Sequence, residues 1–576
     1  MRRLSVADYF VELLIANGIT DVYGYQGGMI AYIFDSLGRY KNKINYHSCG
    51  NEQGAAIAAC SYAQANKKFG VAISTSGPGF TNMTTGIANA WFDSIPVIYV
   101  SGNVNTKDKK RSSGFRQNGF QEIQAVKIAE PITKKVYELE LGDNFIEKFT
   151  DAINEVMTDR RGPVYIDLPI NICREEVEFD DIKPFKLPSF GEIDVREYID
   201  ELYKSEKPVI IAGAGIKESD CENEFKELIN IIGIPVVTTM PAIDILSSNS
   251  DYMMGYIGGT GRREPGIVLQ NADFVLTLGT RICSKQIGHN MSLFIPKAKK
   301  FYRVDVDSAE FERNLKDFEI DINANLRSFI KSALKYVKTK GLSNNAARWS
   351  KTCKEIKDLF TDVDMTYANK MVKYITQMLP DNSNLLYDVG KNLNYCTQSS
   401  VIKNSTKVYM SAGLGAMGYA IPASIGAYNG NNNPTFVFTG DGGAQMNIQE
   451  LNTIVKKKLP IKIFVFNNRA LGNIVMFQDV TFDKRHFATM EKENDYFSCD
   501  FHKIAVAYGM KGIYLNDYKK IDDYKNDLES NEPVLFEIEY EDCDTLPGIV
   551  AGGDYINGGK VILNKELQDK VRELLK

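Results

Sequence analysis

Two short polar motifs, each directly after an apolar run, constrain the fold of this chain more than any other feature. The run Phe436-Val437-Phe438 leads into Gly440-Asp441-Gly442, and the run 461–466 leads into Asn467-Asn468. Both runs are typical of buried strands. An Asp and an Asn at neighbouring strand ends can offer oxygens to one Mg²⁺ ion, which usually keeps phosphate oxygens as well. The glycines let the backbone approach a diphosphate group closely. Taken alone, the pair is also typical of two unrelated loops.

Length and composition exclude several classes of protein. The 576 residues suffice for about three domains, and 44% hydrophobic with 24% charged residues is ordinary for a globular protein. The net charge of −5 gives no support for a nucleic-acid partner. No apolar run approaches the roughly 20 residues that span a membrane, so we expect no membrane partner. Nine scattered cysteines without a C-x-x-C pair, and no signal-peptide pattern, favour a cytoplasmic location.

Short β-rich runs alternate with helical patterns along the chain, which predicts α/β architecture with parallel sheets and crossover helices. We place three domains at residues 1–172, 191–340 and 366–576, with a linker at 173–190 and a helical link at 340–365. The predicted strands are 71–74, 97–100, 163–169, 207–215, 234–238, 274–278, 301–305, 385–389, 407–409, 435–438, 461–466 and 534–540.

Three further motifs accompany the first pair. Asn51-Glu52-Gln53 precedes a run of small residues and reads as a helix start with one carboxylate, although a Glu there is also common for dipole reasons alone. Thr75-Ser76-Gly77-Pro78-Gly79 follows a predicted strand and forms a turn that permits close approach. The segment 411–418 holds three glycines and Met417, an apolar wedge that is also typical of a core residue.

In this order the motifs resemble the acetolactate synthase (acetohydroxyacid synthase) branch of the thiamine diphosphate-dependent decarboxylase-like enzymes, over nearly the whole chain. Further matching segments are Tyr25-Gln26-Gly27-Gly28, Phe120-Gln121-Glu122, Arg161-Gly162-Pro163-Val164 and Val304-Asp305-Val306-Asp307. The resemblance implies three doubly wound parallel-sheet domains: pyrimidine-binding, central and diphosphate-binding. It also implies a homodimer or homotetramer with active sites at the subunit interface.

The resemblance assigns roles to individual residues. Glu52 would hydrogen-bond the aminopyrimidine ring of the cofactor and promote its imino tautomer, with Gln121 and Lys134 on the substrate side. Asp441 and Asn468 would bind Mg²⁺ through their side chains, and Ala470 through its carbonyl group. Phe120, Asn473 and Phe477 would line the substrate pocket. The implied cofactor-binding residues are Gly28, Glu52, Pro78, Gly390, Lys391, Asn392, Gly415, Met417, Asp441, Gly442, Gly443, Asn468, Ala470, Leu471, Gly472 and Asn473.

Departures from the family pattern bear on the acceptor. Asn51 stands where His is usual before the catalytic Glu, and Lys391-Asn392 stands where Gln-His is usual. Asn473 and Phe477 stand where acetolactate synthases carry Met and Trp. A wider and more polar pocket suggests an acceptor larger than pyruvate, such as a keto-sugar, and drift within a synthase explains the same changes equally well.

The leading hypothesis is a carboligase that decarboxylates a 2-oxo acid, with pyruvate the first candidate, and transfers the two-carbon unit to an acceptor carbonyl. A plain decarboxylase is disfavoured because residues 100–130 hold no His pair. A nucleotide-dependent oxidoreductase is disfavoured because the third Gly of its fingerprint would fall at Glu218. A catalytically inactive relative would not need Glu52, Asp441 and Asn468 together.

Flavin stays open at this point. The segments 213–215 and 279–281, together with Asp305, fit the FAD cleft of the family, yet 281–285 reads Arg-Ile-Cys-Ser-Lys where the family has Arg-Phe-Asp-Asp-Arg. The motifs also leave open the acceptor, the choice between dimer and tetramer, a regulatory subunit and the pathway.

Overall fold

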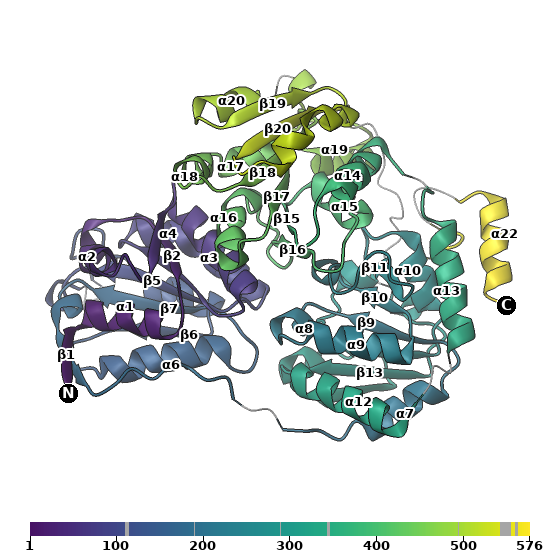
Figure 1. The fold of residues 1–576 in the computed structure, drawn as a ribbon, viewed down its shortest axis with the longest axis horizontal. Helices are drawn as coiled ribbons and strands as arrows, with labels where there is room; N and C mark the ends of the chain where they lie inside the picture. Colours follow the sequence, from purple (N-terminus) through teal and green to yellow (C-terminus); the bar gives the residue numbers. More distant parts are fainter. Residues whose placement is uncertain are drawn as a thin grey trace.

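The computed structural model describes residues 1–109, 114–188, 191–288, 290–342, 346–363, 365–493, 495–541, 554–558 and 563–576. Within this part of the chain, three α/β units each hold a six-stranded parallel sheet covered by helices (Figure 1). The predicted fold class is thereby confirmed. No helix of these described residues is long and apolar enough to cross a membrane.

The N-terminal sheet has the order β3-β2-β4-β5-β7-β6. Its strands are β2 (Asp21–Gly24), β3 (Asn45–Ser48), β4 (Gly70–Ser74), β5 (Val97–Asn103), β6 (Lys135–Glu138) and β7 (Val164–Pro169). Its helices are α1 (Val6–Ala16), α2 (Ala31–Arg39), α3 (Glu52–Asn66), α4 (Pro78–Phe92), α5 (Ala125–Ala129) and α6 (Phe145–Met157). Part of the predicted linker is wrong, because β8 (Glu176–Phe179) pairs antiparallel with β1 (Arg2–Ser5) and so returns to this unit.

The central sheet has the order β11-β10-β9-β12-β13-β14. Its strands are β9 (Pro208–Ala212), β10 (Val236–Thr238), β11 (Met253–Tyr256), β12 (Phe274–Leu278), β13 (Lys300–Asp305) and β14 (Glu319–Asn323). Its helices are α7 (Arg196–Lys204), α8 (Gly215–Glu218), α9 (Glu222–Ile232), α10 (Arg263–Gln270), α11 (Ser284–Ile287), α12 (Leu326–Lys340) and α13 (Ala347–Leu359). The helical link predicted at 340–365 contains α13.

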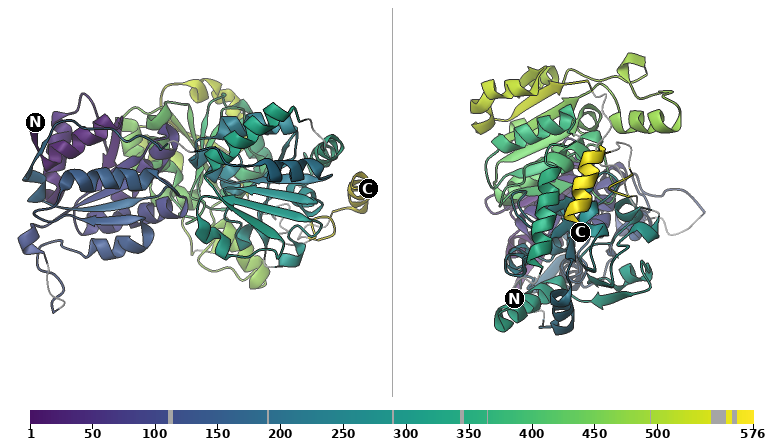
Figure 2. Two further views of the ribbon diagram at one scale, coloured as in Figure 1. Left: turned by 90° about the horizontal axis from the view of Figure 1, so that it is seen from below. Right: turned by 90° about the vertical axis from the view of Figure 1, so that its right-hand side faces the viewer.

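The C-terminal sheet has the order β16-β15-β17-β18-β20-β19. Its strands are β15 (Asn384–Tyr387), β16 (Lys407–Met410), β17 (Thr435–Gly440), β18 (Ile461–Asn467), β19 (Lys511–Leu515) and β20 (Val534–Glu539). Its helices are α14 (Tyr367–Met378), α15 (Lys391–Ser399), α16 (Ala420–Asn431), α17 (Asp441–Met446), α18 (Glu450–Lys456), α19 (Gly472–Thr481), α20 (Phe501–Ala507) and α21 (Lys525–Glu529). The last helix, α22 (Lys565–Leu574), packs beside α13 on the central unit (Figures 1 and 2).

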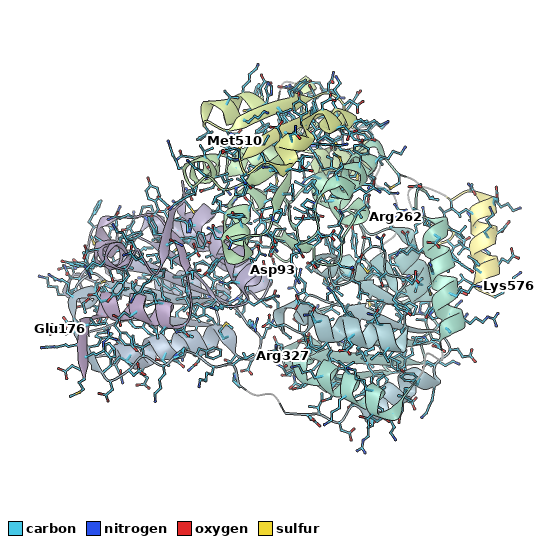
Figure 3. The ribbon with its side chains drawn as sticks, in the orientation of Figure 1. Asp93, Glu176, Arg262, Arg327, Met510 and Lys576 are labelled. Atoms are coloured by element: carbon cyan, nitrogen blue, oxygen red, sulfur yellow. The ribbon has the colours of Figure 1, made fainter. Side chains whose placement is uncertain are left out.

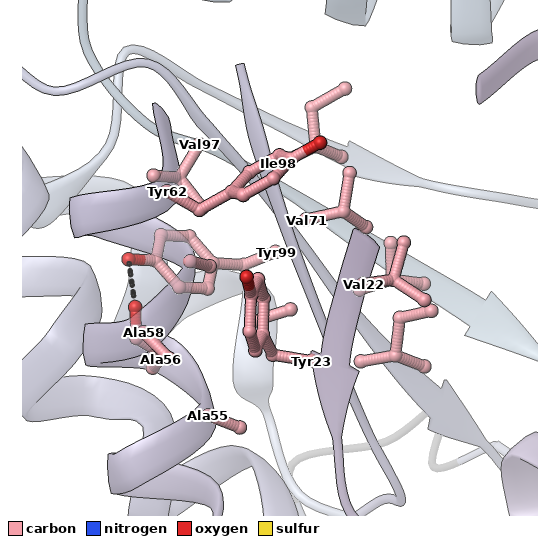
Figure 4. Packing of buried hydrophobic residues seen from close by; sticks show 14 of the residues in the cluster. Val22, Tyr23, Ala55, Ala56, Ala58, Tyr62, Val71, Val97, Ile98 and Tyr99 are labelled. Carbon is pink, nitrogen blue, oxygen red and sulfur yellow. Dashed lines mark hydrogen bonds between the residues drawn. The ribbon is translucent and has the colours of Figure 1, made fainter. Parts of the chain in front are cut away.

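The N-terminal and C-terminal units share one hydrophobic core, joined where α3 meets α16. Both helices are rich in small residues, so their backbones approach closely: a Cβ added at Gly426 would lie 1.9 Å from the carbonyl oxygen of Ala58. Figure 4 shows part of this core in the N-terminal unit, where Tyr99 donates a hydrogen bond to the Ala56 carbonyl at 3.3 Å. The contact between α3 and α16 packs α3, whose first residue is Glu52, against the C-terminal unit.

Candidate active site

The carboxyl ends of β17 and β18 bring the two leading motifs to one edge of the C-terminal sheet. The strands are parallel neighbours, with Gly440 opposite Phe466, so Asp441 and Asn468 follow adjacent strand ends. Asp441 is buried at the first position of α17, where the helix dipole favours a negative charge. This edge of a parallel sheet is where ligands bind in such folds.

The Asp441 carboxylate is buried but still hydrogen-bonded. Tyr496 donates its hydroxyl to Asp441 Oδ2 at 3.1 Å. Burial raises the pKa of Asp441 to about 6, against hydrogen bonds from the Gly442 amide, Tyr496 and Ser498 that lower it. No cation of the described residues pairs with this carboxylate, and a buried carboxylate of this kind suits a metal ion.

The two asparagines at the end of β18 have different surroundings. Asn467 is fully buried and its amide is engaged, since Nδ2 donates to Glu537 Oε1 at 2.7 Å and Oδ1 accepts from Ser498 Oγ at 2.9 Å. Asn468 is only partly buried and lines a cavity with Ala470. Arg469, which lies between Asn468 and Ala470 in the sequence, has a φ of 51°, a strained value for a non-glycine residue. Of the two asparagines, Asn468 is thus the less buried one at this cavity.

Several predicted cofactor residues converge on Gly442. A Cβ added there would lie 2.9 Å from Leu471 Cδ2, 3.2 Å from Met417 Cε and 3.3 Å from the Tyr496 hydroxyl. Leu471 precedes α19 and Met417 lies in the loop before α16, so three separate segments meet at this point. A side chain at position 442 would therefore press against the ends of these three side chains.

Asp388, which the sequence analysis did not single out, holds the glycine loop that carries Met417. Its Oδ1 accepts from the Gly418 amide at 2.8 Å, and its Oδ2 accepts from the Ala420 amide at 3.0 Å. Burial raises the pKa of Asp388 to about 6, against these hydrogen bonds. The sequence feature that could have identified Asp388 is its position at a strand end, directly after the apolar run Leu385-Leu386-Tyr387.

The other predicted diphosphate residues begin α15. Gly390 has a φ of 149°, and Lys391 is buried with Nζ 5.8 Å from the Tyr395 ring. Asn392 Nδ2 donates to the carbonyl oxygens of Asp388 at 2.9 Å and Phe438 at 3.3 Å. Asn392 thus ties the ends of β15 and β17 together, and Lys391 lines the cavity beside Asn468.

Two of the predicted cofactor-binding glycines have open space beside their Cα atoms. A Cβ added at Gly415, where φ is 73°, would have no atom within 4 Å, and the same holds at Gly28. Gly443 is different, because an added Cβ would lie 2.8 Å from Asp388 Oδ1. Gly415 and Gly28 therefore border open space, whereas Gly443 is needed for packing.

Glu52 begins α3 in the N-terminal unit and is buried there. Asn82 Nδ2 on α4 donates to Glu52 Oε2 at 2.9 Å, and a Cβ added at Gly79 would lie 3.3 Å from Glu52 Oε1. Pro78 begins α4 directly before that glycine. The carboxylate is therefore fixed between the starts of α3 and α4.

The predicted substrate-side residues lie in different places. Gln121 has a φ of 61°, and its carbonyl oxygen would be 2.8 Å from a Cβ added at Gly77, so it lies against the turn that begins α4. Phe120 is 76% exposed. Lys134 donates to the carbonyl of Thr158 at 2.9 Å and pairs with Glu155, which places it at the end of α6.

The acceptor-side residues lie on α19. Asn473 Oδ1 accepts a 3.3 Å hydrogen bond from Asn394 Nδ2, which leaves its own amide protons directed elsewhere. Phe477 is 55% exposed and meets Phe482 edge-to-face at 5.8 Å between centroids. Gly472 lines the cavity next to Asn468 and Ala470. The structure thus groups α19 with the candidate metal ligands.

A second cavity lies where the three units meet. It is lined by Ala214, Gly215, Gly279, Thr280, Arg281 and Asp305 of the central unit, all within or beside the motifs that fit a flavin cleft. Asp93 of the N-terminal unit also lines it and accepts from the Gly413 amide at 2.7 Å (Figure 3).

The predicted ligands at the C-terminal sheet edge, Asp441, Asn468 and Ala470, would offer one carboxylate, one side-chain amide and one backbone carbonyl. All three offer oxygen, which fits Mg²⁺. In the part of the chain that the structure describes, no group of three or more His, Cys, Asp or Glu could hold a metal, so a site of thiolate or imidazole type finds no support there.

The chain is similar to known proteins over most of its length. Residues 4–128, 195–333 and 388–538 match the N-terminal TPP binding domain, the central domain and the C-terminal TPP binding domain of thiamine pyrophosphate enzymes. The probable acetolactate synthase large subunit of Methanocaldococcus jannaschii is 30% identical over 96% of this chain and 94% of its own length. The acetolactate synthase large subunit of Lactococcus lactis is 30% identical over 95% of each chain. Isozyme 2 of Escherichia coli K12 is 27% identical over 96% and 98%.

Proposed function

The chain belongs to the thiamine pyrophosphate enzyme family and is related to acetolactate synthases, and we propose that it is a Mg²⁺-dependent carboligase. It decarboxylates a 2-oxo acid, with pyruvate the first candidate, and transfers the two-carbon unit to an acceptor carbonyl. The observation that supports this proposal is that Asp441, Asn468 and Ala470 follow the neighbouring ends of β17 and β18, with the Gly442 backbone close to Met417 and Leu471.

In this proposal the C-terminal unit holds the diphosphate end of the cofactor. Asp441, Asn468 and the Ala470 carbonyl bind Mg²⁺, and the α15 N-terminus with Lys391 faces the phosphates. Met417 and Leu471 meet over Gly442 and form an apolar wall. Thiamine diphosphate, when bound, supplies the nucleophilic carbon and the electron sink of the reaction.

Glu52 is the proton-handling group of the proposed site. Its Oε2 is occupied by Asn82, so Oε1 is the oxygen available to the aminopyrimidine ring. Gly79 leaves space beside that oxygen. Because Glu52 lies between α3 and α4, the residue can hold or move a proton at one defined position.

We propose that two copies of the chain complete each site. Glu52 belongs to the N-terminal unit and Asp441 to the C-terminal unit, and large apolar side chains of both units are exposed: Phe120, Leu414, Met446 and Phe497. Such exposure is typical of a surface that another chain covers. A homodimer is the smallest assembly that would cover this surface, and a homotetramer would contain two such dimers.

The side chains of α19 bear on the identity of the acceptor substrate. Asn473 has amide protons to donate to an acceptor oxygen, and Phe477 supplies an apolar wall. These side chains favour a carbonyl acceptor larger than pyruvate, such as a keto-sugar, as the second candidate. The cavity at the meeting point of the three units is the candidate flavin site, with Arg281 and Asp305 as its charged groups.

The test is a pyruvate-consumption assay on pure protein with thiamine diphosphate and Mg²⁺, with products read by mass spectrometry and flavin by the visible spectrum. Acetolactate formation supports a synthase, and slow CO₂ release that speeds up with keto-sugars supports the larger acceptor. Glu52→Gln should lower turnover by about 10²-fold or more while the cofactor still binds. Unchanged turnover in that variant would remove the catalytic assignment.

A further inference from the structure

One face of α18 is bound to the backbone segment that leads into Glu52. Glu450, Thr453 and Lys457 lie on this face, at the helical spacing that aligns side chains. Lys457 Nζ donates to the carbonyl of Tyr46 at 2.9 Å, and Thr453 Oγ1 donates to the carbonyl of Ser48 at 3.0 Å. The segment thus passes along the helix from the end of β3 to the start of α3.

Glu450 makes the last contact of this series. Its Oε1 accepts from the Gly50 amide at 2.9 Å and from the Asn51 amide at 3.3 Å, and its Oε2 accepts from Thr453 at 3.1 Å. The side chain is fully buried. A Cβ added at Gly54 would lie 2.3 Å from Glu450 Oε1, so the carboxylate sits directly against the first turn of α3.

These contacts end one residue before Glu52. Asn51 is the N-cap of α3: its side chain accepts from the Gln53 amide at 2.8 Å, while its own amide is held by Glu450. The cap decides where α3 begins and hence where the Glu52 side chain leaves the backbone. Asn82 then holds the far end of Glu52.

We propose that Glu450 is a positioning residue for Glu52: from the C-terminal unit of the same chain, it fixes the start of α3 and thereby the place of the Glu52 carboxylate. The inference rests on the proposed role of Glu52. It assigns a role in catalysis to a carboxylate that touches neither the cofactor nor the metal ligands in the proposed site.

A purely structural role would make Glu450 no different from its neighbour Thr453, which is also buried and bridges the same two elements. Thr453→Val is therefore the matched control, because it removes the hydrogen bonds to the Ser48 carbonyl and to Glu450 Oε2 but leaves Glu450 Oε1, which accepts from the Gly50 and Asn51 amides, in place. Glu450→Gln keeps an oxygen that can accept from Gly50 and Asn51, whereas Glu450→Ala removes it.

The experiment compares these variants as full-length holoenzymes. We expect Glu450→Ala to lower kcat at least 10-fold, with the KM for the 2-oxo acid and the Kd for the cofactor changed less than about 3-fold. Glu450→Gln should restore kcat to within about 3-fold of wild type, and Thr453→Val should keep it despite a lower Tm. Loss of kcat in Thr453→Val equal to that in Glu450→Ala would overturn the proposal.

A second readout separates this inference from the proposed function. Near-ultraviolet circular dichroism of the bound cofactor reports the state of its aminopyrimidine ring without any substrate. If wild-type protein binds no thiamine diphosphate, the proposed function fails. If it binds the cofactor and Glu450→Ala leaves the spectrum unchanged, Glu450 does not position Glu52. Should the Ala variant fail to fold, Glu450→Asp, which withdraws the carboxylate by one methylene, replaces it, with an intermediate change expected.

Discussion

The N-terminal and C-terminal sheets have the same strand order, and the central sheet has another. Numbered along the chain within each sheet, the first two read 2-1-3-4-6-5, and the central one reads 3-2-1-4-5-6. The pairing registers also correspond, since β4 meets β5 from Gly70 opposite Val97, and β17 meets β18 from Thr435 opposite Ile461. Two units of one topology can therefore be compared residue by residue.

The comparison bears on why we propose a metal site in one unit and not in the other. Counted from these registers, Ser76 stands in the N-terminal unit where Asp441 stands in the C-terminal unit, and Val104 stands where Asn468 stands. The same strand ends thus carry two oxygen donors in one unit and, in the other, a small hydroxyl and an apolar side chain. The fold supplies the position, and a few side chains decide its chemistry.

A buried pair is common to both units. Asn103 Nδ2 donates to both Asp167 oxygens at 3.0 Å, and Asn467 Nδ2 donates to Glu537 Oε1 at 2.7 Å, at equivalent places on the fourth and sixth strands. In each unit the Asn oxygen also accepts a nearby backbone amide. These pairs hold the strand ends together whether or not a metal is to be bound.

The largest expected effect follows from giving the C-terminal unit the residue of its counterpart. Asp441→Ser should weaken Mg²⁺-dependent binding of thiamine diphosphate by about 100-fold or more, because it removes the one carboxylate among the proposed ligands. Titration calorimetry with and without Mg²⁺ measures this. Ser76→Ala, at the equivalent place, is the control and should change the Kd less than about 3-fold. Wild-type affinity in Asp441→Ser would refute the metal site.

The buried pairs provide the next effect, on stability. Asn103→Leu and Asn467→Leu should each lower the free energy of unfolding by about 1–3 kcal/mol, because each leaves a buried carboxylate short of a donor. Chemical denaturation measures both. A large loss in one unit and none in the other would show that the two pairs are not equivalent.

Sequence reasoning found the strands that are continuous apolar runs and missed those that are not. Of the strands it missed, β3, β6, β11, β14 and β19 are sheet edges, and four of these mix polar or charged residues with apolar ones, the exception being β11. The inner strand β2 (Asp21–Gly24) was missed because it begins with a charged residue and ends with a glycine, so that only Val22 and Tyr23 form its apolar part. Its neighbours β4 and β5 were found because both are buried throughout.

The candidate site divides in the same way. Asp441 and Glu52 were found because a strand end or a helix start marks them in the local sequence. Tyr496 and Glu450 were missed because their roles depend on contacts between distant segments: Tyr496 reaches Asp441 from 55 residues away, and Glu450 reaches Gly50 from 400 away. No local pattern distinguishes such residues from others on the same helix or loop.

The smallest expected effect comes from a buried strand position that holds a lysine in the C-terminal unit and an isoleucine in the N-terminal unit. Lys462 on β18 donates to the carbonyls of Ser530 at 2.7 Å and Glu532 at 2.6 Å, and the equivalent residue of β5 is Ile98. Burial lowers the pKa of Lys462 to about 8 from an ordinary value of 10.5. Between these values the unfolded chain holds a proton that the folded chain lacks, so stability should rise with pH.

The slope should reach at most about 1.4 kcal/mol for each pH unit between roughly pH 8 and 10. Lys462→Met should remove this term, so the difference in Tm between variant and wild type should change steadily with pH over that window. Ile98→Val, at the equivalent place in the N-terminal unit, should give a Tm difference that does not vary with pH. If both differences stay constant, Lys462 is charged in the folded protein throughout, and its three acceptors, including the Ser530 hydroxyl at 3.2 Å, suffice to hold an ammonium group inside the sheet.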